Sequence, residues 1–110
     1  MTYAIDFDGT LVEDKFPEIG EPIKDRVALV QLLRCKGHKI ILWTCRTGES
    51  LQRAVDYCEN MLHLKFDAVN QNLPEVQQKW GGDTRKVFAD FYVDDKSADW
   101  QDVFREVMLP

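Results

Sequence analysis

The chain has 110 residues, of which 45% are hydrophobic and 30% charged, and its formal net charge is −5. This length fits one core, so we expect a single domain over residues 1–110. The negative charge argues against broad binding to nucleic acids or anionic membranes, and no apolar run approaches the roughly 20 residues that span a bilayer. The N-terminus shows no signal-peptide pattern. The 3 cysteines are odd in number, so we expect reduced thiols and a cytoplasmic protein.

The N-terminal segment predicts a short buried strand, residues 3–7, that runs into two acids. Strand side chains alternate, so Asp6 and Asp8 would share a face if the strand continued, and Gly9 allows a sharp turn. Ligands bind at the carboxyl ends of strands in open α/β sheets, and two carboxylates there need a cation or a proton between them. Taken alone, a strand that ends in an ordinary Asp-Gly turn explains the same pattern.

Helices and strands alternate along the rest of the chain. In order, the pattern predicts a helix through 23–33, a strand over 38–44, a helix through 51–62, a strand over 66–69, a short helix from Pro74 to near Gly81, a strand over 87–93 and a helix through 100–108. Gly37 would stop the first helix, and Ser97 or Asp99 would cap the last. This alternation predicts an α/β three-layer sandwich, with a central parallel sheet covered on both faces. Trp43, Trp80 and Trp100 are expected in its core.

Polar residues also follow two later strands. Thr44 closes an apolar strand, and a hydroxyl with free backbone N–H groups at such a turn can cradle a phosphate, although a helix cap explains it equally well. Asp94 and Asp95 follow the last predicted strand, and Lys86 lies just before it. Carboxylates from two strand ends, a hydroxyl from a third and a nearby lysine together predict a magnesium site with a cation to offset a phosphate.

These residues resemble the motifs of the haloacid dehalogenase superfamily of phosphotransferases. The first motif, Asp-x-Asp-x-Thr after a strand, matches residues 6–10, and the second, a Ser or Thr that closes an apolar strand, matches Thr44. The third, an upstream lysine, is best matched by Lys86, with Lys79 as the alternative, and the fourth is the acidic pair at 94–95. The resemblance implies a Rossmann-like fold of the haloacid dehalogenase type and a magnesium-dependent phosphatase.

The resemblance also implies a role for each acid. Asp6 would be the nucleophile that forms an aspartyl-phosphate, and Asp8, oriented by Thr10, would act as general acid and then as general base. Mg²⁺ would be bound by the Asp6 carboxylate, the Asp8 backbone carbonyl and the Asp95 carboxylate, with Asp94 acting through water or behind the direct ligands.

Four further residues would meet the phosphorylated substrate. Thr44 would donate a hydrogen bond to the phosphoryl oxygens, and Lys86 would neutralise their charge. Cys45 would act through its backbone N–H. Arg46 would either grip the substrate as a phosphate fork or make a surface ion pair.

Many relatives insert a cap domain, whereas residues 11–22 and 70–83 leave room here for only a loop and one short helix. We therefore expect a capless minimal core, whose pocket is completed by a bulky substrate or by a second subunit that contacts the loop at Phe16, Pro17 and Ile19. Two rival functions stay open: a magnesium- and phosphate-binding domain without turnover, and a receiver-type signalling domain. The receiver class carries its acidic motifs in the reverse order along the chain.

Overall fold

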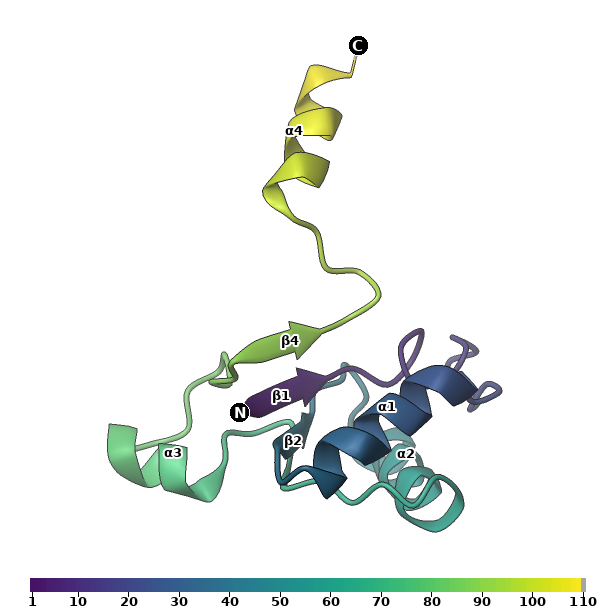
Figure 1. The fold of residues 1–110 in the computed structure, drawn as a ribbon, viewed down its shortest axis with the longest axis vertical. Helices are drawn as coiled ribbons and strands as arrows, with labels where there is room; N and C mark the ends of the chain where they lie inside the picture. The colour runs from purple at the N-terminus through teal and green to yellow at the C-terminus, as the bar shows by residue number, and fades with distance from the viewer. Residues whose placement is uncertain (110) are drawn as a thin grey trace.

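A parallel four-stranded sheet forms the centre of the fold, with strand order β3-β2-β1-β4. The computed structural model describes residues 1–109. The strands are β1 (Thr2–Ile5), β2 (Lys39–Leu42), β3 (Ala68–Val69) and β4 (Phe91–Val93). The helices are α1 (Lys24–Cys35), α2 (Gly48–Met61), α3 (Pro74–Trp80) and α4 (Trp100–Met108). Helices and strands alternate along the chain (Figure 1), which confirms the predicted α/β class and the parallel sheet.

Helices α1 and α2 pack on one face of the sheet and bury the main core. Alternate side chains of the strands point to this face, because strand side chains have a period of two. The cluster joins sheet and helix residues, among them Ile5, Phe7, Ile40, Leu42, Val27, Val30, Ala54 and Cys58. This layer holds β1 and β2 in place, and the carboxyl ends of these two strands carry the predicted site residues.

The opposite face is covered only in part. Ala4 and Ile41 point to that side and pack against Leu73, Val87 and Ala89, at the start of α3 and just before β4. Helix α4 adds nothing to either face, because it stands away from the body of the protein (Figure 1). The predicted coverage of both faces is therefore only partly present, and β4 is exposed along its whole length.

Local signals place the helix ends as predicted. Gly37, with φ of +87°, follows α1, and Gly81, with φ of +77°, caps α3 in the left-handed region that glycine tolerates best. Asp99 caps α4 through a capping box with Asp102. Thr47 occupies the N-cap position of α2 without a side-chain cap hydrogen bond.

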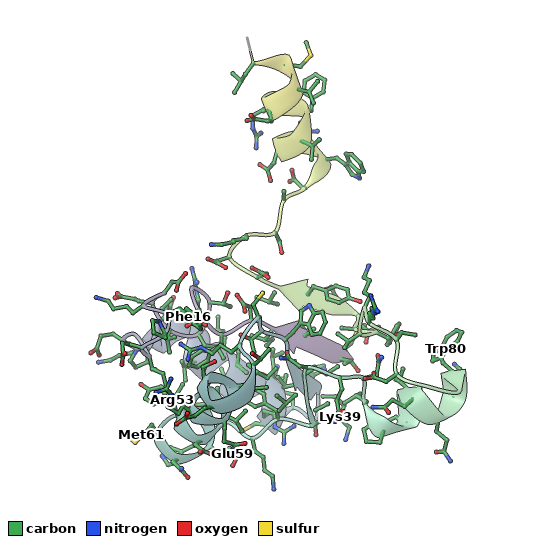
Figure 2. The ribbon with its side chains drawn as sticks, turned by 180° about the vertical axis from the view of Figure 1, so that it is seen from behind. Phe16, Lys39, Arg53, Glu59, Met61 and Trp80 are labelled. Atoms are coloured by element: carbon green, nitrogen blue, oxygen red, sulfur yellow. The ribbon has the colours of Figure 1, made fainter. Side chains whose placement is uncertain are left out.

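Two predictions about packing are wrong. Trp80 is 68% exposed and Trp100 is 84% exposed, so neither lies in the core; Figure 2 shows Trp80 at the surface beside α3. Trp43 alone of the three packs partly against buried residues. Ile19, expected on an exposed loop, is half-buried against the main core. Among residues 1–109, no helix is both long enough and apolar enough to cross a membrane.

Candidate functional site

The loops that follow β1, β2 and β4 meet at one edge of the sheet and line a pocket of about 700 Å³. Carboxyl ends of parallel strands share an edge, which is the usual ligand-binding position in such sheets. The lining residues are Asp6, Asp8, Asp14, Phe16, Trp43, Thr44, Cys45, Arg46, Asp94, Asp95 and Lys96. Most of the residues that the sequence assigns to the site therefore share one cavity.

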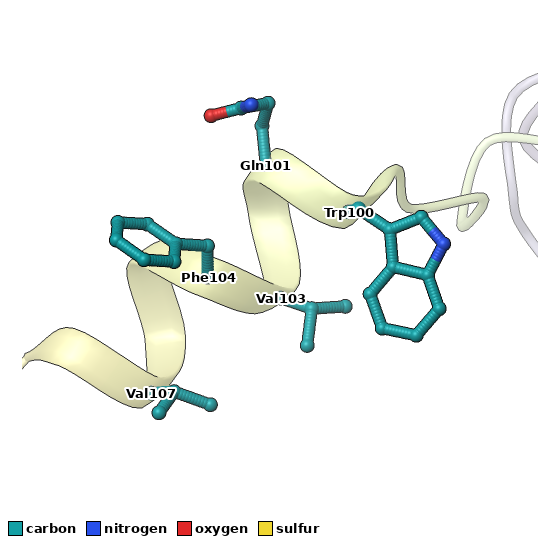
Figure 3. Close-up of a pocket in the computed structure, with 5 residues that line it drawn as sticks. All are labelled: Trp100, Gln101, Val103, Phe104 and Val107. Carbon is teal, nitrogen blue, oxygen red and sulfur yellow. The ribbon is translucent and has the colours of Figure 1, made fainter.

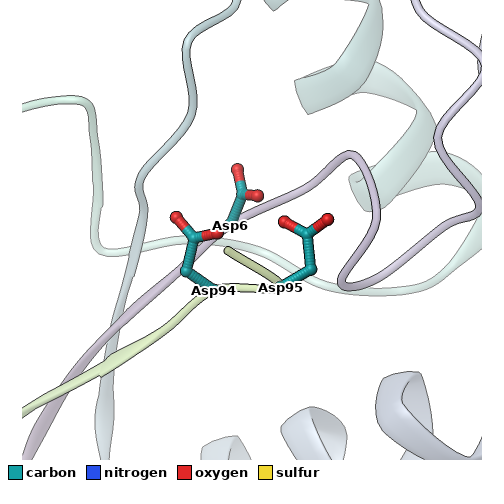
Figure 4. A group of neighbouring side chains, drawn as sticks. All are labelled: Asp6, Asp94 and Asp95. Atoms are coloured by element: carbon teal, nitrogen blue, oxygen red, sulfur yellow. The ribbon is translucent and has the colours of Figure 1, made fainter. Parts of the chain in front are cut away.

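Three carboxylates converge in this pocket. Asp6, Asp94 and Asp95 each offer an oxygen atom, and these atoms lie within 4.8 Å of one another (Figure 4). A backbone hydrogen bond of 3.0 Å from the Asp6 N–H to the Val93 carbonyl holds the two strand ends together. The pKa of Asp6 is raised from 3.8 to about 6, chiefly by burial and to a smaller extent by the negative charges of Asp94, Asp95 and Asp8.

Gly9 lets the acidic pair approach the first loop. Its φ is +84°, and a Cβ built on it would lie 2.3 Å from Oδ2 of Asp95 and 2.7 Å from Cγ. No side chain fits at such distances, so the Asp95 carboxylate rests against bare backbone. Arg26 donates hydrogen bonds to the carbonyls of Gly9 and Thr10, at 3.1 and 3.3 Å, which fixes this turn from the side of α1.

Asp8 is held by Arg46 in a two-pronged ion pair. The Nε of Arg46 donates to Oδ2 of Asp8 and the second guanidinium nitrogen, Nη2, donates to Oδ1, each at 2.8 Å. The Arg46 side chain is only 1% exposed. The hydrogen bond to Asp8 raises the pKa of the guanidinium above its ordinary value. Both carboxylate oxygens thus accept charge-assisted hydrogen bonds in a fixed geometry.

The remaining N–H groups of Arg46 bind the backbone. They donate to the carbonyls of Pro17, Glu18 and Ser50 at 2.9–3.3 Å. Five donated hydrogen bonds use the full capacity of a guanidinium, so no donor is left for a phosphate. Neither predicted role for Arg46 is met: its ion pair is buried, and it points into the protein.

The predicted partner of Asp8 makes no such contact. Oγ1 of Thr10 is buried and has no hydrogen-bond partner among the described residues. Arg46, not Thr10, orients Asp8. Sequence reasoning missed this pair because the two residues are 38 positions apart and nothing local signals their contact. The one available clue was a charged residue directly after a buried strand.

Two backbone N–H groups of the loop after β2 are bound within the protein, so they are not free to cradle a phosphate. The Thr44 N–H donates to Oδ1 of Asn70 at 2.8 Å, and the Arg46 N–H donates to Oγ1 of Thr44 at 3.2 Å. Asn70, which the sequence did not single out, also donates from Nδ2 to the Arg46 carbonyl at 3.3 Å. Its φ of +52° suits an Asn at a turn. Cys45 lines the pocket with an exposed side chain.

Lys86 does not reach the pocket. It lies before β4, at the amino end of the sheet, where the Asp90 N–H pairs with the Thr2 carbonyl at 2.8 Å. Its ammonium sits 5.4 Å from the centre of the Tyr92 ring. Lys79, the alternative, lies against Trp80 on α3, 5.7 Å from the ring centre. A residue that precedes a parallel strand lies at the amino end of the sheet, opposite the edge that carries the pocket, so Lys86 is at the wrong end for the predicted role.

Lys96 is the lysine that lines the pocket, and the sequence analysis missed it. Its ammonium lies 3.4 Å from Oδ2 of Asp95. The charge of Asp95 raises the pKa of Lys96, so this side chain is held as a cation beside the acids. A lysine directly after an acidic pair was the available signal.

The donor set of the pocket fits a hard divalent cation. Carboxylate oxygens are the ligands that Mg²⁺ prefers, and the three neighbouring carboxylates gather negative charge that a dication would offset. No histidine or cysteine belongs to this cluster within residues 1–109. The residues that would hold the ion are Asp6, Asp94 and Asp95.

A solved structure resembles the fold described above. It belongs to a conserved protein from Bacteroides thetaiotaomicron and superposes with a TM-score of 0.78, at 40% sequence identity, over 97% of this chain and 88% of that chain. No protein-family model matches the chain, and no curated protein matches it. The relative's description names no reaction, so the chemistry has to be argued from the pocket.

Proposed function

This chain belongs to the same family as the conserved Bacteroides thetaiotaomicron protein, and from its acidic pocket we propose that it is a magnesium-dependent phosphatase that acts through an aspartyl-phosphate on Asp6. The observation that carries the proposal is the set of three carboxylates within 4.8 Å of one another, at the carboxyl edge of a parallel sheet. Thr44 and Lys96 line the same pocket and supply a hydroxyl and a cation. Bound there, Mg²⁺ would offset the charge that builds on the phosphoryl group.

In the first step, a carboxylate oxygen of Asp6 attacks phosphorus, and the bond from phosphorus to the leaving oxygen breaks. The leaving oxygen departs with the electron pair of that bond and takes a proton from water in the open pocket, which makes it the alcohol product. Thr44 donates a hydrogen bond to the phosphoryl oxygens, and the Cys45 N–H supplies a second donor. Lys96 takes the charge-offsetting role that the sequence analysis gave to Lys86, because its ammonium lies at the pocket.

In the second step, water attacks the aspartyl-phosphate and restores Asp6. Asp8 accepts the proton of that water, and both of its oxygens are already placed by Arg46. A carboxylate whose oxygens are fixed as hydrogen-bond acceptors suits the general-base role that the sequence predicted for Asp8. The product, inorganic phosphate, then leaves through the open side of the pocket.

We also assign the fold to the haloacid dehalogenase type as a capless minimal core. The support is the motif order with the acids at one sheet edge, and the short connection between β1 and α1, where Val12 bridges to Asp8 and Pro22. We place the protein in the cytoplasm, which agrees with its free cysteines at positions 35, 45 and 58. The substrate is a phosphate monoester whose identity a panel of phosphorylated metabolites would reveal.

The test is phosphate release with and without Mg²⁺ by the wild type and by Asp6→Asn. The variant keeps the shape of the side chain but removes the nucleophile, so turnover should fall by several orders of magnitude. Glu59→Gln, on the outer side of α2, is the matched control and should leave turnover unchanged. Wild-type activity in a pure Asp6→Asn protein would overturn the mechanism. Magnesium and phosphate binding without turnover would instead support the non-catalytic alternative.

A further inference from the structure

Helix α4 carries an apolar face that touches no other part of the described chain. Figure 1 shows the helix apart from the body, and Figure 2 shows its side chains surrounded by no others. Apolar residues recur at the spacing that places them on one side of a helix. Their exposed fractions are 84% for Trp100, 43% for Val103, 60% for Phe104 and 73% for Val107. In Figure 3, Trp100, Val103 and Val107 lie along one side, and Phe104 lies between that side and the side of Gln101.

The helix is nevertheless well formed. Asp99 accepts a hydrogen bond from the Asp102 N–H at 2.9 Å, and Asp102 accepts one from the Asp99 N–H at 3.0 Å. This capping box satisfies the helix start without help from the body. An isolated helix of 9 residues is marginal in water, so a stable α4 needs a surface that covers its apolar face.

The same chain leaves a matching surface uncovered at β4. Phe91 and Val93 point to the sheet face that α1 and α2 cover elsewhere, since Phe91 pairs with Tyr3 and Val93 with Ile5. They are 47% and 43% exposed. Tyr3 stacks on Phe91 with ring centres 5.1 Å apart, which extends the patch onto β1. The helical layer therefore stops one strand short, where another helix would continue it.

We propose that α4 docks on this β4 surface of a second copy of the chain, and that two copies exchange their helices reciprocally. Each copy supplies one helix and one surface, so a closed two-fold dimer satisfies both without another protein. The segment 94–99 already carries α4 away from its own β4, beginning with a turn in which the Lys96 N–H donates to Oδ1 of Asp94 at 2.8 Å. Exchange between two chains keeps this outward direction of segment 94–99. Docking of α4 on its own chain would require the segment to turn back toward β4.

The exposed area suffices for a stable dimer. Aromatic side chains bury about 150–250 Å² each, so Trp100 and Phe104 alone bring roughly 300 Å² of exposed surface per helix. With two helices, their valines and the two surfaces that they cover, the total reaches roughly 1,200–1,600 Å², within the usual size of a specific interface.

Light scattering after size exclusion tests the proposal on the full chain. The wild type should have twice the chain mass of 12.8 kDa, and Phe104→Glu should have the monomer mass. Arg105→Gln, which changes the charge by the same amount on the polar side of α4, should stay dimeric. Because residue 104 is exposed within each chain, the circular dichroism of the body should not change. A monomeric wild type, or a dimeric Phe104→Glu, would overturn the proposal.

Cross-linking separates exchange from docking within one chain. In a background with the exposed residues Cys35 and Cys45 changed to serine, we would mix Phe91→Cys protein with Val103→Cys protein and oxidise the mixture. Exchange predicts a disulfide-linked pair that contains one chain of each kind. A double variant that forms the disulfide within a single chain of monomer mass would show that α4 folds back, and the proposal would be wrong.

Discussion

Position 9 requires a glycine, because Asp95 lies against its backbone. Gly9→Ala adds a Cβ only 2.3 Å from Oδ2 of Asp95, at a φ of +84°. Gly81→Ala is a matched control, because Gly81 has a φ of +77° but nothing lies within 4 Å of its Cβ position. Each variant pays the backbone cost of about 1–2 kcal/mol for an L-residue in the left-handed region.

Magnesium binding should separate these two variants. Gly9→Ala must displace the Asp95 carboxylate, so its affinity for Mg²⁺, measured by calorimetry, should fall by at least about tenfold, as for a ligand moved out of place. Gly81→Ala should bind Mg²⁺ like the wild type. Equal affinities in the two variants would mean that Asp95 takes no part in the site.

The pair of Asp8 and Arg46 should matter for stability as well as for position. Arg46→Met leaves the carboxylate of Asp8, which is 16% exposed, without its partner, together with carbonyls that have lost a donor. Removal of one member of a buried ion pair costs about 3–5 kcal/mol. Arg46→Lys should recover only part of this loss, because a lysine cannot form both prongs.

Urea denaturation measures the effect, and Arg53→Met is its control. Arg53 lies exposed on α2 (Figure 2), and its loss should change the free energy of unfolding by less than about 0.5 kcal/mol. If Arg46→Met were as stable as Arg53→Met, the guanidinium would not be holding Asp8 and the loop that contains Pro17.

At the scale of elements, the helices were the most predictable features. Their signals are local: apolar spacing, Pro74 at the start of α3 and a left-handed glycine after α1 and α3. Strand ends were less predictable, because they depend on which neighbour is present. Residues 87–90 have the composition of a strand, yet pairing with β1 begins at Tyr3 and Phe91. Lys86 precedes this strand, so it lies at the amino end of the sheet and not at the edge that carries the site.

In the site, too, some contacts could be predicted from the sequence and others could not. The meeting of Asp6 with Asp94 and Asp95 follows from sheet geometry, since parallel strands end at one edge. The contacts of Arg46 and Asn70 do not, because each joins residues more than 20 positions apart through a side chain in a loop. Periodicity also marks the apolar face of α4, but it carries no information about what that face meets.

At the scale of the whole molecule, Asp6 makes stability depend on pH. Its pKa is about 6 in the folded protein against an ordinary 3.8, so the folded state favours the protonated form. The resulting contribution to stability is complete below pH 3.8 and is lost as the pH rises through 6. The Asp6 side chain is only partly buried, so solvent screens the effect and the expected loss is only about 1 kcal/mol.

Without magnesium, Asp6→Asn should therefore melt at a higher temperature than the wild type at pH 7.5, and the two should converge near pH 4. Added Mg²⁺ should close the gap at pH 7.5 by stabilising the wild type alone, and it should bind more weakly below pH 6, where a proton competes for Asp6. Thermal melts of both proteins across this range supply the measurement. A wild type that melts at a higher temperature than Asp6→Asn at pH 7.5 without magnesium would contradict this prediction.

The position of the acidic pair links the two ends of the molecule. Asp94 and Asp95 belong to the candidate ion site, and they also begin the segment that carries α4 outward. Anchoring α4 would restrict that segment, and an ion held by its first residues would restrict it too, so each event lowers the entropy cost of the other. If both proposals hold, the apparent magnesium affinity rises with the protein's own concentration, and the enzyme would respond to its abundance without any dedicated regulatory site.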